Sequence, residues 1–293
     1  MNATQPTLAI LGSDGVPRLK PLDEPVLRAD EHSATRGDGV FETMHVRGRE
    51  VWLRDAHLDR MFRSASKLGF ELPAREQLEA VVSTAVNAWR EGSDGEAGVK
   101  LVCSRGSEYA PELGPTVWSM AFGISPALIR KRREGIAMMS LSFGYSTAER
   151  ERSPWLLGGA KTLSYAVNMA AIRYAVETGF DDVLFTSSDG YVLEGPTSTV
   201  VWAVDDTLFT VPHYTGILPS TTVGYLTENA HTLGLKTEDR MVTVDELSQA
   251  DAAWLCSSVR GIVEITSLDG AKLGRSPLHG ALARLLGFPN NAV

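Results

Sequence analysis

The sequence predicts an α+β protein of two domains, and three observations support this. The chain has 293 residues, which is enough for two hydrophobic cores of ordinary size. Strand-like and helix-like segments occur in separate blocks in each half. Between residues 125 and 134 a proline and four consecutive basic residues, Arg130–Arg133, break this pattern. We therefore expect an N-terminal domain over residues 1–126, a linker over 127–134 and a C-terminal domain over 135–293.

The first half predicts strands around a pair of helices. The apolar stripe Leu58, Met61, Phe62, Ala65 and Leu68 indicates a helix that Asp55 caps and Gly69 ends. A second helix is predicted over about Ala74–Arg90, with Leu78, Val81, Val82, Ala85 and Trp89 facing inward. The predicted strands are residues 8–19, Gly39–Val46, Glu50–Leu53, Gly98–Ser104 and Thr116–Ile124, with a hairpin turn at Arg47–Arg49.

The second half predicts a further set of strands with three helices. A long helix over Thr162–Thr178 follows the glycine pair Gly158-Gly159 and ends at Gly179. Another runs from about Ser220 to Leu233, with Val223, Leu226 and Ala230 on one face, and a short helix closes the chain. The predicted strands, most of them antiparallel, are Ile136–Phe143, Asp182–Thr186, Tyr191–Leu193, Thr197–Val204, Thr207–Val211, Trp254–Cys256 and Ile262–Thr266.

Composition and missing motifs exclude several classes of protein. No apolar run approaches the roughly 18–20 residues of a membrane span, and no basic region precedes the short apolar stretch near the N-terminus, so we expect a cytoplasmic protein. The two cysteines, Cys103 and Cys256, have neither disulfide nor zinc-site spacing, and no metal site is expected. The net charge of −8 argues against a nucleic-acid partner. Phosphate-loop, nucleophile-elbow, zinc-protease and dinucleotide motifs are absent from the sequence.

Four positions carry residue types that suit chemistry, and each also has a simpler structural interpretation. Lys161 follows two glycines and begins an apolar segment, where desolvation would make an amine nucleophilic, although a first-turn surface lysine fits too. Glu194 interrupts an apolar strand before Gly195, as either an inward charge or an edge residue. The segment Gly216–Thr222 leads into a helix and can be a cap or an anion site. Arg60 lies beside an apolar stripe and can bind a phosphate or form a surface salt bridge.

Together these segments resemble the fold-type IV family of pyridoxal 5′-phosphate (PLP) enzymes, which includes aminodeoxychorismate lyase and the D-amino-acid and branched-chain aminotransferases. The resemblance covers about residues 30–270, and no single motif in it is highly specific. The segments that carry it, in order, are Gly37-Asp38-Gly39-Val40-Phe41-Glu42, His57-Leu58-Asp59-Arg60, Gly159-Ala160-Lys161, Leu193-Glu194-Gly195 and Leu218-Pro219-Ser220-Thr221-Thr222.

The resemblance implies a role for each matching residue. Lys161 would form the Schiff base with PLP and later carry the proton, and Glu194 would hold the pyridine nitrogen protonated. The phosphate would be bound by Arg60, Thr221, Thr222 and Ser258. The substrate would contact Phe41 and Arg260. Members of this family are generally dimers, so a homodimer is expected.

The turn after the strand ending at Ser104 bears on the reaction. D-amino-acid aminotransferases of this family have an Arg-x-His there that binds the substrate carboxylate, whereas this chain has Ala110 and Glu112 at those places. Branched-chain aminotransferases differ in their first strand and in the turn where this chain has Cys256–Gly261. The segment Ser104-Arg105-Gly106 is most similar to aminodeoxychorismate lyase, which forms 4-aminobenzoate and pyruvate for folate synthesis. A branched-chain or D-amino-acid aminotransferase is the alternative, and a PLP-binding regulator without turnover also stays open.

Arg260 is unusual for the family at its position. A substrate with two carboxylates would suit an extra arginine, so we predict that Arg260 binds one of them. The simpler interpretation is an arginine turned toward solvent.

Overall fold

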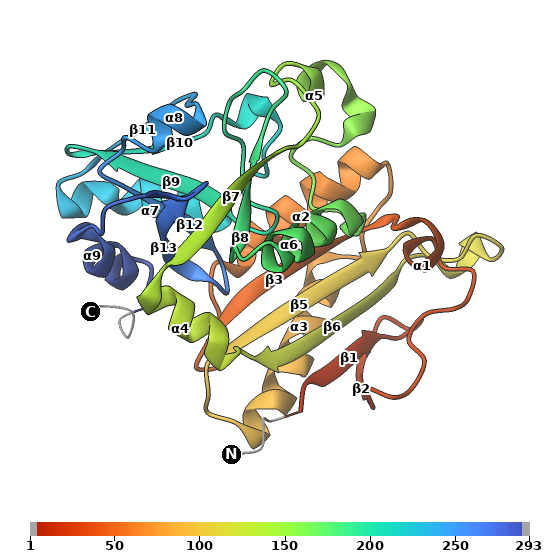
Figure 1. Cartoon of the computed structure of the whole chain (residues 1–293). Coiled ribbons are helices and arrows are strands. Elements are labelled where there is room, and N and C mark those ends of the chain that lie inside the picture. The colour runs from red at the N-terminus through yellow and green to blue at the C-terminus, as the bar shows by residue number, and fades with distance from the viewer. Residues whose placement is uncertain (1–4, 289–293) are drawn as a thin grey trace. The chain divides into compact units, whose positions relative to one another are not determined.

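The computed structural model describes residues 5–288 and divides into two compact units (Figure 1). Unit 1 consists of Met1–Ser125 and Ala160–Tyr165, and unit 2 of Pro126–Gly159 and Ala166–Val293. Two expectations about the domains are therefore wrong. The segment 127–134 is not a linker but helix α4 (Pro126–Glu134) of unit 2, and Lys161 lies in a short segment that packs with unit 1.

Unit 1 contains a six-stranded antiparallel sheet in the order β2-β1-β6-β5-β3-β4. Its strands are β1 (Thr7–Leu11), β2 (Pro17–Lys20), β3 (Gly39–Arg47), β4 (Glu50–Val51), β5 (Ala97–Ser104) and β6 (Thr116–Gly123). Its helices are α1 (His32–Arg36), α2 (Arg54–Leu68), α3 (Arg75–Gly92) and the 3₁₀ turn η1 (Pro111–Leu113).

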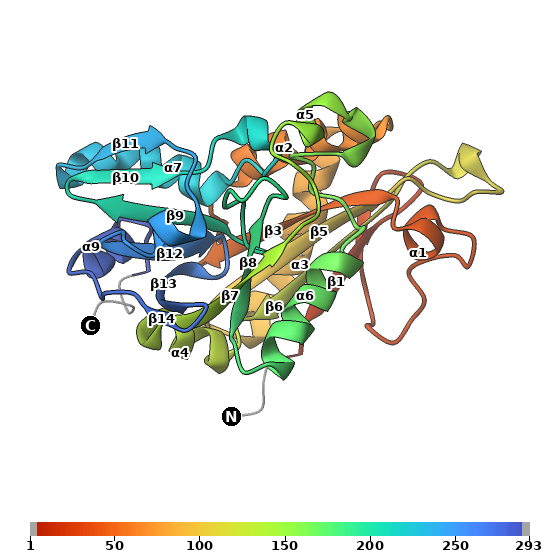
Figure 2. The same cartoon turned by 45° about the horizontal axis from the view of Figure 1, so that its top comes forward.

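Helices α2 and α3 cover one face of this sheet and form the core of unit 1 with it (Figures 1 and 2). The predicted stripe of α3 is buried, including the fully enclosed Trp89. Helix α2 ends at Gly69 as predicted, with φ of 68°. It begins at Arg54 after Leu53, however, so Asp55 lies in its first turn and is not the cap.

Unit 2 contains an eight-stranded mixed sheet, in the order β11-β10-β9-β12-β13-β7-β8 with β14 paired to β13. Strand β7 is parallel to both β8 and β13, and β10 is parallel to β11, so the sheet is less uniformly antiparallel than expected. Its strands are β7 (Ile136–Ser142), β8 (Asp182–Thr186), β9 (Thr199–Val204), β10 (Thr207–Thr210), β11 (Lys236–Asp239), β12 (Ala252–Ser257), β13 (Gly261–Leu268) and β14 (Ala271–Lys272). The predicted strand Tyr191–Leu193 forms isolated bridges instead.

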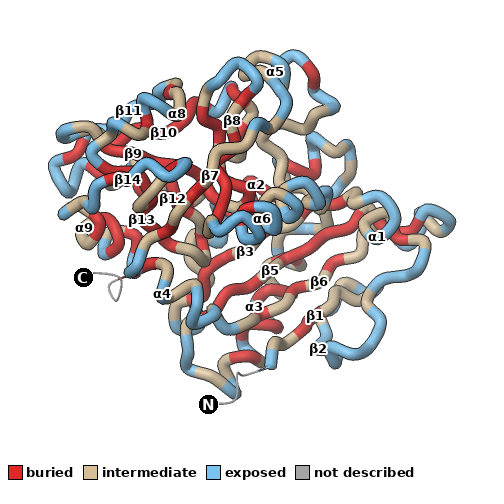
Figure 3. The backbone as a smooth tube through the Cα atoms, viewed as in Figure 1, coloured by how far each residue is buried: buried red, intermediate tan, exposed pale blue. Residues whose placement is uncertain are grey.

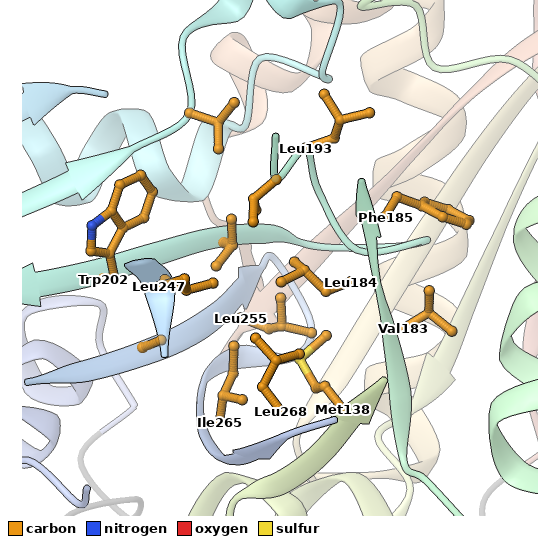
Figure 4. Packing of buried hydrophobic residues seen from close by; sticks show 14 of the residues in the cluster. Met138, Val183, Leu184, Phe185, Leu193, Trp202, Leu247, Leu255, Ile265 and Leu268 are labelled. Atoms are coloured by element: carbon orange, nitrogen blue, oxygen red, sulfur yellow. The ribbon is translucent and has the colours of Figure 1, made fainter. Parts of the chain in front are cut away.

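Helices pack on this sheet at several strands: α4 and α9 on β13, α7 on β12, and α6 on β7 and β8. Their bounds, with those of the shorter turns, are α5 (Glu149–Arg152), η2 (Pro154–Leu156), α6 (Ala166–Glu177), η3 (His213–Thr215), α7 (Thr221–Asn229), η4 (Ala230–Leu233), α8 (Val244–Leu247) and α9 (Leu278–Leu285). Figure 4 shows the core of unit 2, where Leu184, Leu255 and Ile265 from three strands meet. The central strands of both sheets are the most buried parts of the chain (Figure 3).

Helix α6 begins four residues later than the sequence predicts. The helix was expected from Thr162, but Thr162 forms a bridge with Val40 of β3, and Leu163 N–H donates to the Gly39 carbonyl at 2.9 Å. Lys161 is therefore held by a strand edge and not by a helix start. Within residues 5–288, every helix is too short or too polar to cross a lipid bilayer.

Candidate active site

Lys161 has its backbone fixed on both sides by unit 1. Its N–H donates to the hydroxyl of Ser64 on α2 at 3.0 Å, and its carbonyl accepts from the N–H of Phe41 on β3 at 3.2 Å. Ser64 is itself buried and donates to the carbonyl of Arg60. The position of the Lys161 amine is thus set by a helix and a strand that both belong to the core.

Two aromatic rings lie beside the Lys161 amine. Its Nζ lies 4.4 Å from the ring centroid of Phe41 and 5.7 Å from that of Tyr165, and the two rings meet edge to face. A second amine, that of Lys100 on β5, lies 5.7 Å from the same Phe41 centroid. Phe41 and Lys100 point to the sheet face opposite α2, because side chains alternate along a strand. This face brings an amine nucleophile, a flat apolar surface and a second cation together.

Arg60 belongs to a buried polar network on the other face of the sheet. Its Nε and Nη2 donate to the two carboxylate oxygens of Glu42 at 2.8 and 2.6 Å, and Nδ1 of His57 lies 2.7 Å from Glu42 Oε2. Glu42 and His57 are fully buried and Arg60 is 5% exposed. The interpretation of Arg60 as a surface salt bridge is therefore wrong. Its predicted contact with a phosphate stays a prediction, and Glu42 would orient the guanidinium for it.

The charges in this network follow from burial and pairing. Burial alone would raise the pKa of Glu42, but the adjacent Arg60 and His57 outweigh that effect and lower it. Burial lowers the pKa of His57, with Glu42 opposing and Arg60 reinforcing the shift. The network thus holds an ionised carboxylate, a guanidinium and a neutral imidazole that donates from Nδ1.

Gly39 is a glycine because three backbone segments meet around it. A Cβ built there would lie 2.7 Å from the Cys103 carbonyl oxygen and 2.7 Å from Cδ1 of Leu163, two residues after Lys161. We expect Gly39→Ala to push residues 161–163 off the β3 edge, to cost about 1–3 kcal/mol of stability and to lower kcat about 100-fold through misplacement of the Lys161 amine. Urea unfolding and steady-state kinetics measure both. The control is Gly123→Ala in β6, where the added Cβ makes an ordinary contact with Trp89.

Glu194 in unit 2 is a positioned acid. Its backbone pairs with Phe185 of β8, and its carboxylate accepts from the N–H of Leu218, with Oε2 at 3.1 Å. Arg150 of α5 lies close to the same loops, since a Cβ on Gly216 would be 2.7 Å from the Arg150 Cβ. Burial lowers the pKa of Arg150, and Glu194 opposes that shift. Sequence reasoning missed Arg150, because its proximity to Glu194 and Gly216 joins segments that lie far apart along the chain.

The start of α7 and a neighbouring turn gather donors that suit an anion. The Ser220 hydroxyl accepts from the N–H of Val223, which caps the helix, and Thr221 and Thr222 follow at the positive end of the helix dipole. The buried hydroxyls of Thr222 and Ser258 lie 3.4 Å apart. The same helix start can therefore be capped and bind an anion, because the Ser220 hydroxyl caps it and other N–H groups and hydroxyls would bind the anion.

Arg260 is not turned toward solvent. Its Nη2 lies 2.5 Å from the carboxylate of Asp182 at the start of β8, and its side chain is 14% exposed. A carboxylate of the protein therefore already binds this guanidinium. The predicted contact of Arg260 with a substrate carboxylate stays a prediction, and the ion pair favours a different role.

Both cysteines are free and buried, and burial raises the pKa of each thiol to about 12. Neither is a nucleophile near neutral pH. Of Lys161 and the two cysteines, Lys161 is therefore the residue suited to covalent chemistry.

Comparison with known proteins identifies relatives over nearly the whole chain. A family model described as amino-transferase class IV matches residues 39–268. A bifunctional aminodeoxychorismate lyase / D-amino acid transaminase of Mycobacterium tuberculosis is 38% identical over 269 residues, which are 89% of this chain and 92% of the relative.

Solved structures agree with this match. A hypothetical aminotransferase from Mycobacterium tuberculosis in a PLP-bound form has a TM-score of 0.91 and 36% identity, over 98% of this chain and 99% of its own. The fold IV-transaminase CpuTA1 from Curtobacterium pusillum has a TM-score of 0.90 and 37% identity, over 96% and 99%. The predicted fold class is thereby confirmed.

Proposed function

Because the chain belongs to the class IV aminotransferase family, we propose that it binds PLP and acts as a 4-amino-4-deoxychorismate lyase, forming 4-aminobenzoate and pyruvate. When bound, PLP supplies an aldehyde that condenses with amines and a ring that withdraws electrons. The residues present fit this group: an amine beside two aromatic rings, a carboxylate held by a backbone N–H, and a helix start whose buried Thr222 hydroxyl lies next to that of Ser258.

Each proposed role belongs to a residue of the site described above. Lys161 would hold the cofactor covalently through its Nζ, and the same amine is the base that would take the proton from the amine-bearing carbon of the substrate. Glu194, whose carboxylate accepts from the N–H of Leu218, would be the anionic partner of the ring nitrogen. The groups that would bind the phosphate are the guanidinium of Arg60, the N–H groups and hydroxyls of Thr221 and Thr222, and the hydroxyl of Ser258. Phe41 offers its ring face to the substrate.

The lyase assignment rests on where the chain offers cations to a substrate. Arg105, the arginine of the turn after β5, donates to Asp38 at 2.7 Å and to the Leu68 carbonyl at 2.5 Å, so it serves the fold. Ala110 and Glu112 offer no positive charge. Lys100 instead presents an amine near Phe41, on the same sheet face. This single observation favours a substrate whose carboxylate lies beside an apolar ring, as in 4-amino-4-deoxychorismate.

We expect Lys100→Met to raise KM for 4-amino-4-deoxychorismate by about 10- to 100-fold, since a hydrogen bond to a charged group contributes about 1.5–3 kcal/mol. kcat should change little, because Lys100 binds the substrate and moves no proton. Steady-state pyruvate release measures both constants. Lys272→Met, at an exposed position in β14, is the matched control. An unchanged KM would contradict the role of Lys100.

The assay that tests the function compares two reactions of the same preparation. One measures pyruvate release from 4-amino-4-deoxychorismate, and the other measures amino transfer from D- and L-amino acids to a keto acid. Faster pyruvate release that needs no keto acid supports the lyase. Keto-acid-dependent turnover without pyruvate release would overturn it.

A D-amino-acid aminotransferase is the second candidate, because the relative at 38% identity carries both activities in its name. The absence of an Arg-x-His in the turn after β5 argues against it as the main activity. The two activities share their first chemical requirement, since both begin with an amine substrate and a proton removed by Lys161.

A homodimer in the cytoplasm completes the proposal. Helix α6 supports self-association, because it exposes Val167, Met169, Tyr174 and Val176, and apolar surface of this kind is typical of interfaces. The acidic net charge supports a small-molecule substrate over a nucleic acid.

A further inference from the structure

The turn between β12 and β13 in unit 2 is held by two arginines that the proposed chemistry does not use. This turn spans Ser257–Gly261 and carries Ser258, whose hydroxyl lies beside that of Thr222. Gly261 has φ of 71°, so the turn reverses tightly. Whatever fixes this turn also fixes the Ser258 hydroxyl.

Arg132 of α4 binds the turn through its backbone. Its Nε donates to the carbonyl of Arg260 at 2.8 Å and its Nη2 to the carbonyl of Val259 at 2.6 Å. The side chain is 2% exposed and lies over the ring of Phe288, 4.7 Å from the centroid. A planar guanidinium can bind two successive carbonyls at fixed angles, whereas an ammonium has no such geometry.

Arg260 binds the same turn to the sheet through its side chain. Its partner Asp182 is 3% exposed and stands at the first position of β8, where its Oδ1 also accepts from the N–H of Val183. Asp182 is thus fixed by its own strand. The turn is restrained at its carbonyls from α4 and at its side chain from β8.

We propose that Arg132 and the Arg260–Asp182 ion pair are positioning residues for the anion site formed by Ser258, Thr222 and the start of α7. They hold the Ser258 hydroxyl where it donates to the cofactor phosphate, and they touch neither phosphate nor substrate. This inference rests on the proposed PLP-binding function. It assigns Arg260 to the fold of the site, in place of the substrate contact expected from the sequence.

The test measures how strongly each variant recognises the phosphate group. The dissociation constants of PLP and of pyridoxal, which lacks the phosphate, are measured for the apoprotein by absorbance. We expect Arg132→Lys and Asp182→Asn each to weaken PLP binding about 10- to 100-fold, as when other residues that orient a ligand-binding group are changed. The affinity for pyridoxal should stay the same. Arg133→Lys, at an exposed neighbouring position on α4, is the matched control.

A general loss of stability predicts a different pattern. Equal weakening of PLP and pyridoxal binding, or unchanged binding of both, would overturn the proposal. Arg260→Ala separates the two roles of that residue. Weaker PLP binding with an unchanged substrate KM supports positioning, and a raised KM with unchanged PLP binding overturns it.

Inorganic phosphate makes failure of this inference distinguishable from failure of the proposed function. If the unaltered protein binds no PLP, the proposed function fails, but phosphate should still raise its melting temperature. Arg132→Lys and Asp182→Asn should reduce that rise, while Arg133→Lys should not. Equal responses to phosphate in all variants would overturn the positioning role.

Discussion

Replacing Lys161 by alanine is expected to abolish covalent attachment of PLP and to lower kcat by about 10⁴-fold, the upper end of what a positioned proton-transfer group contributes. The amine is proposed to act both as the covalent anchor and as the base, so this one substitution removes both functions. Borohydride treatment of the PLP-loaded protein, followed by peptide mass analysis, should place the label at residue 161.

Lys161→Arg is the matched variant for this experiment. It retains a cation near the Phe41 ring but cannot form the covalent link, so it should bind PLP without being trapped by borohydride. The amine of Lys100 makes the mapping necessary, because it lies near the same ring. A borohydride label that persists in Lys161→Ala would contradict the assignment of the anchoring residue.

The helices and most strands are predictable because their signals are local. The buried positions of α3 follow the helical period of its own sequence, and Gly69 ends α2 where the apolar stripe ends. The extended segment around Lys161 is different. Its sequence has the composition of a helix, but its hydrogen bonds go to β3, about 120 residues earlier, and this tertiary pairing overrides the local preference.

In the candidate site, too, local motifs are predictable from the sequence and long-range contacts are not. Lys161, Glu194 and the start of α7 lie in motifs short enough to recognise along the chain. The side-chain contacts around the site join residues that lie far apart in sequence: Glu42 meets Arg60 across 18 residues, Arg132 meets Val259 across 127, and Asp182 meets Arg260 across 78. Residue spacing along the sequence does not reveal such pairs. For this reason we expected Arg132 in a linker and assigned Arg260 to a substrate contact.

The buried network of unit 1 gives the largest expected effect on stability. We expect Glu42→Gln to lower the free energy of unfolding at pH 7 by about 3–5 kcal/mol, because it leaves the guanidinium of Arg60 buried without a counter-charge. Glutamine keeps the shape and one acceptor oxygen, so the loss reports charge and not volume. Urea unfolding of the apoprotein measures it, with Glu76→Gln at an exposed position of α3 as the control.

The pH dependence of this loss distinguishes an ionised Glu42 from a merely hydrogen-bonded one. The pKa of Glu42 is lower in the folded protein than its ordinary value of 4.5, so the unfolded chain takes up a proton first as pH falls. The ionised Glu42 therefore makes its full contribution to the free energy of unfolding above about pH 4.5, and this contribution is lost as the pH falls below that value. The stability gap between the unaltered protein and Glu42→Gln should narrow in that range.

His57 adds to this acid sensitivity in the same direction. Its pKa is lowered from 6.5 by burial, so below pH 6.5 the unfolded chain binds a proton that the folded protein does not, and stability falls. A gap of less than about 1 kcal/mol at pH 7, the range of exposed ion pairs, would contradict the network. So would a gap that stays constant between pH 7 and pH 3, since Glu42 would then have the same pKa in the folded and the unfolded state.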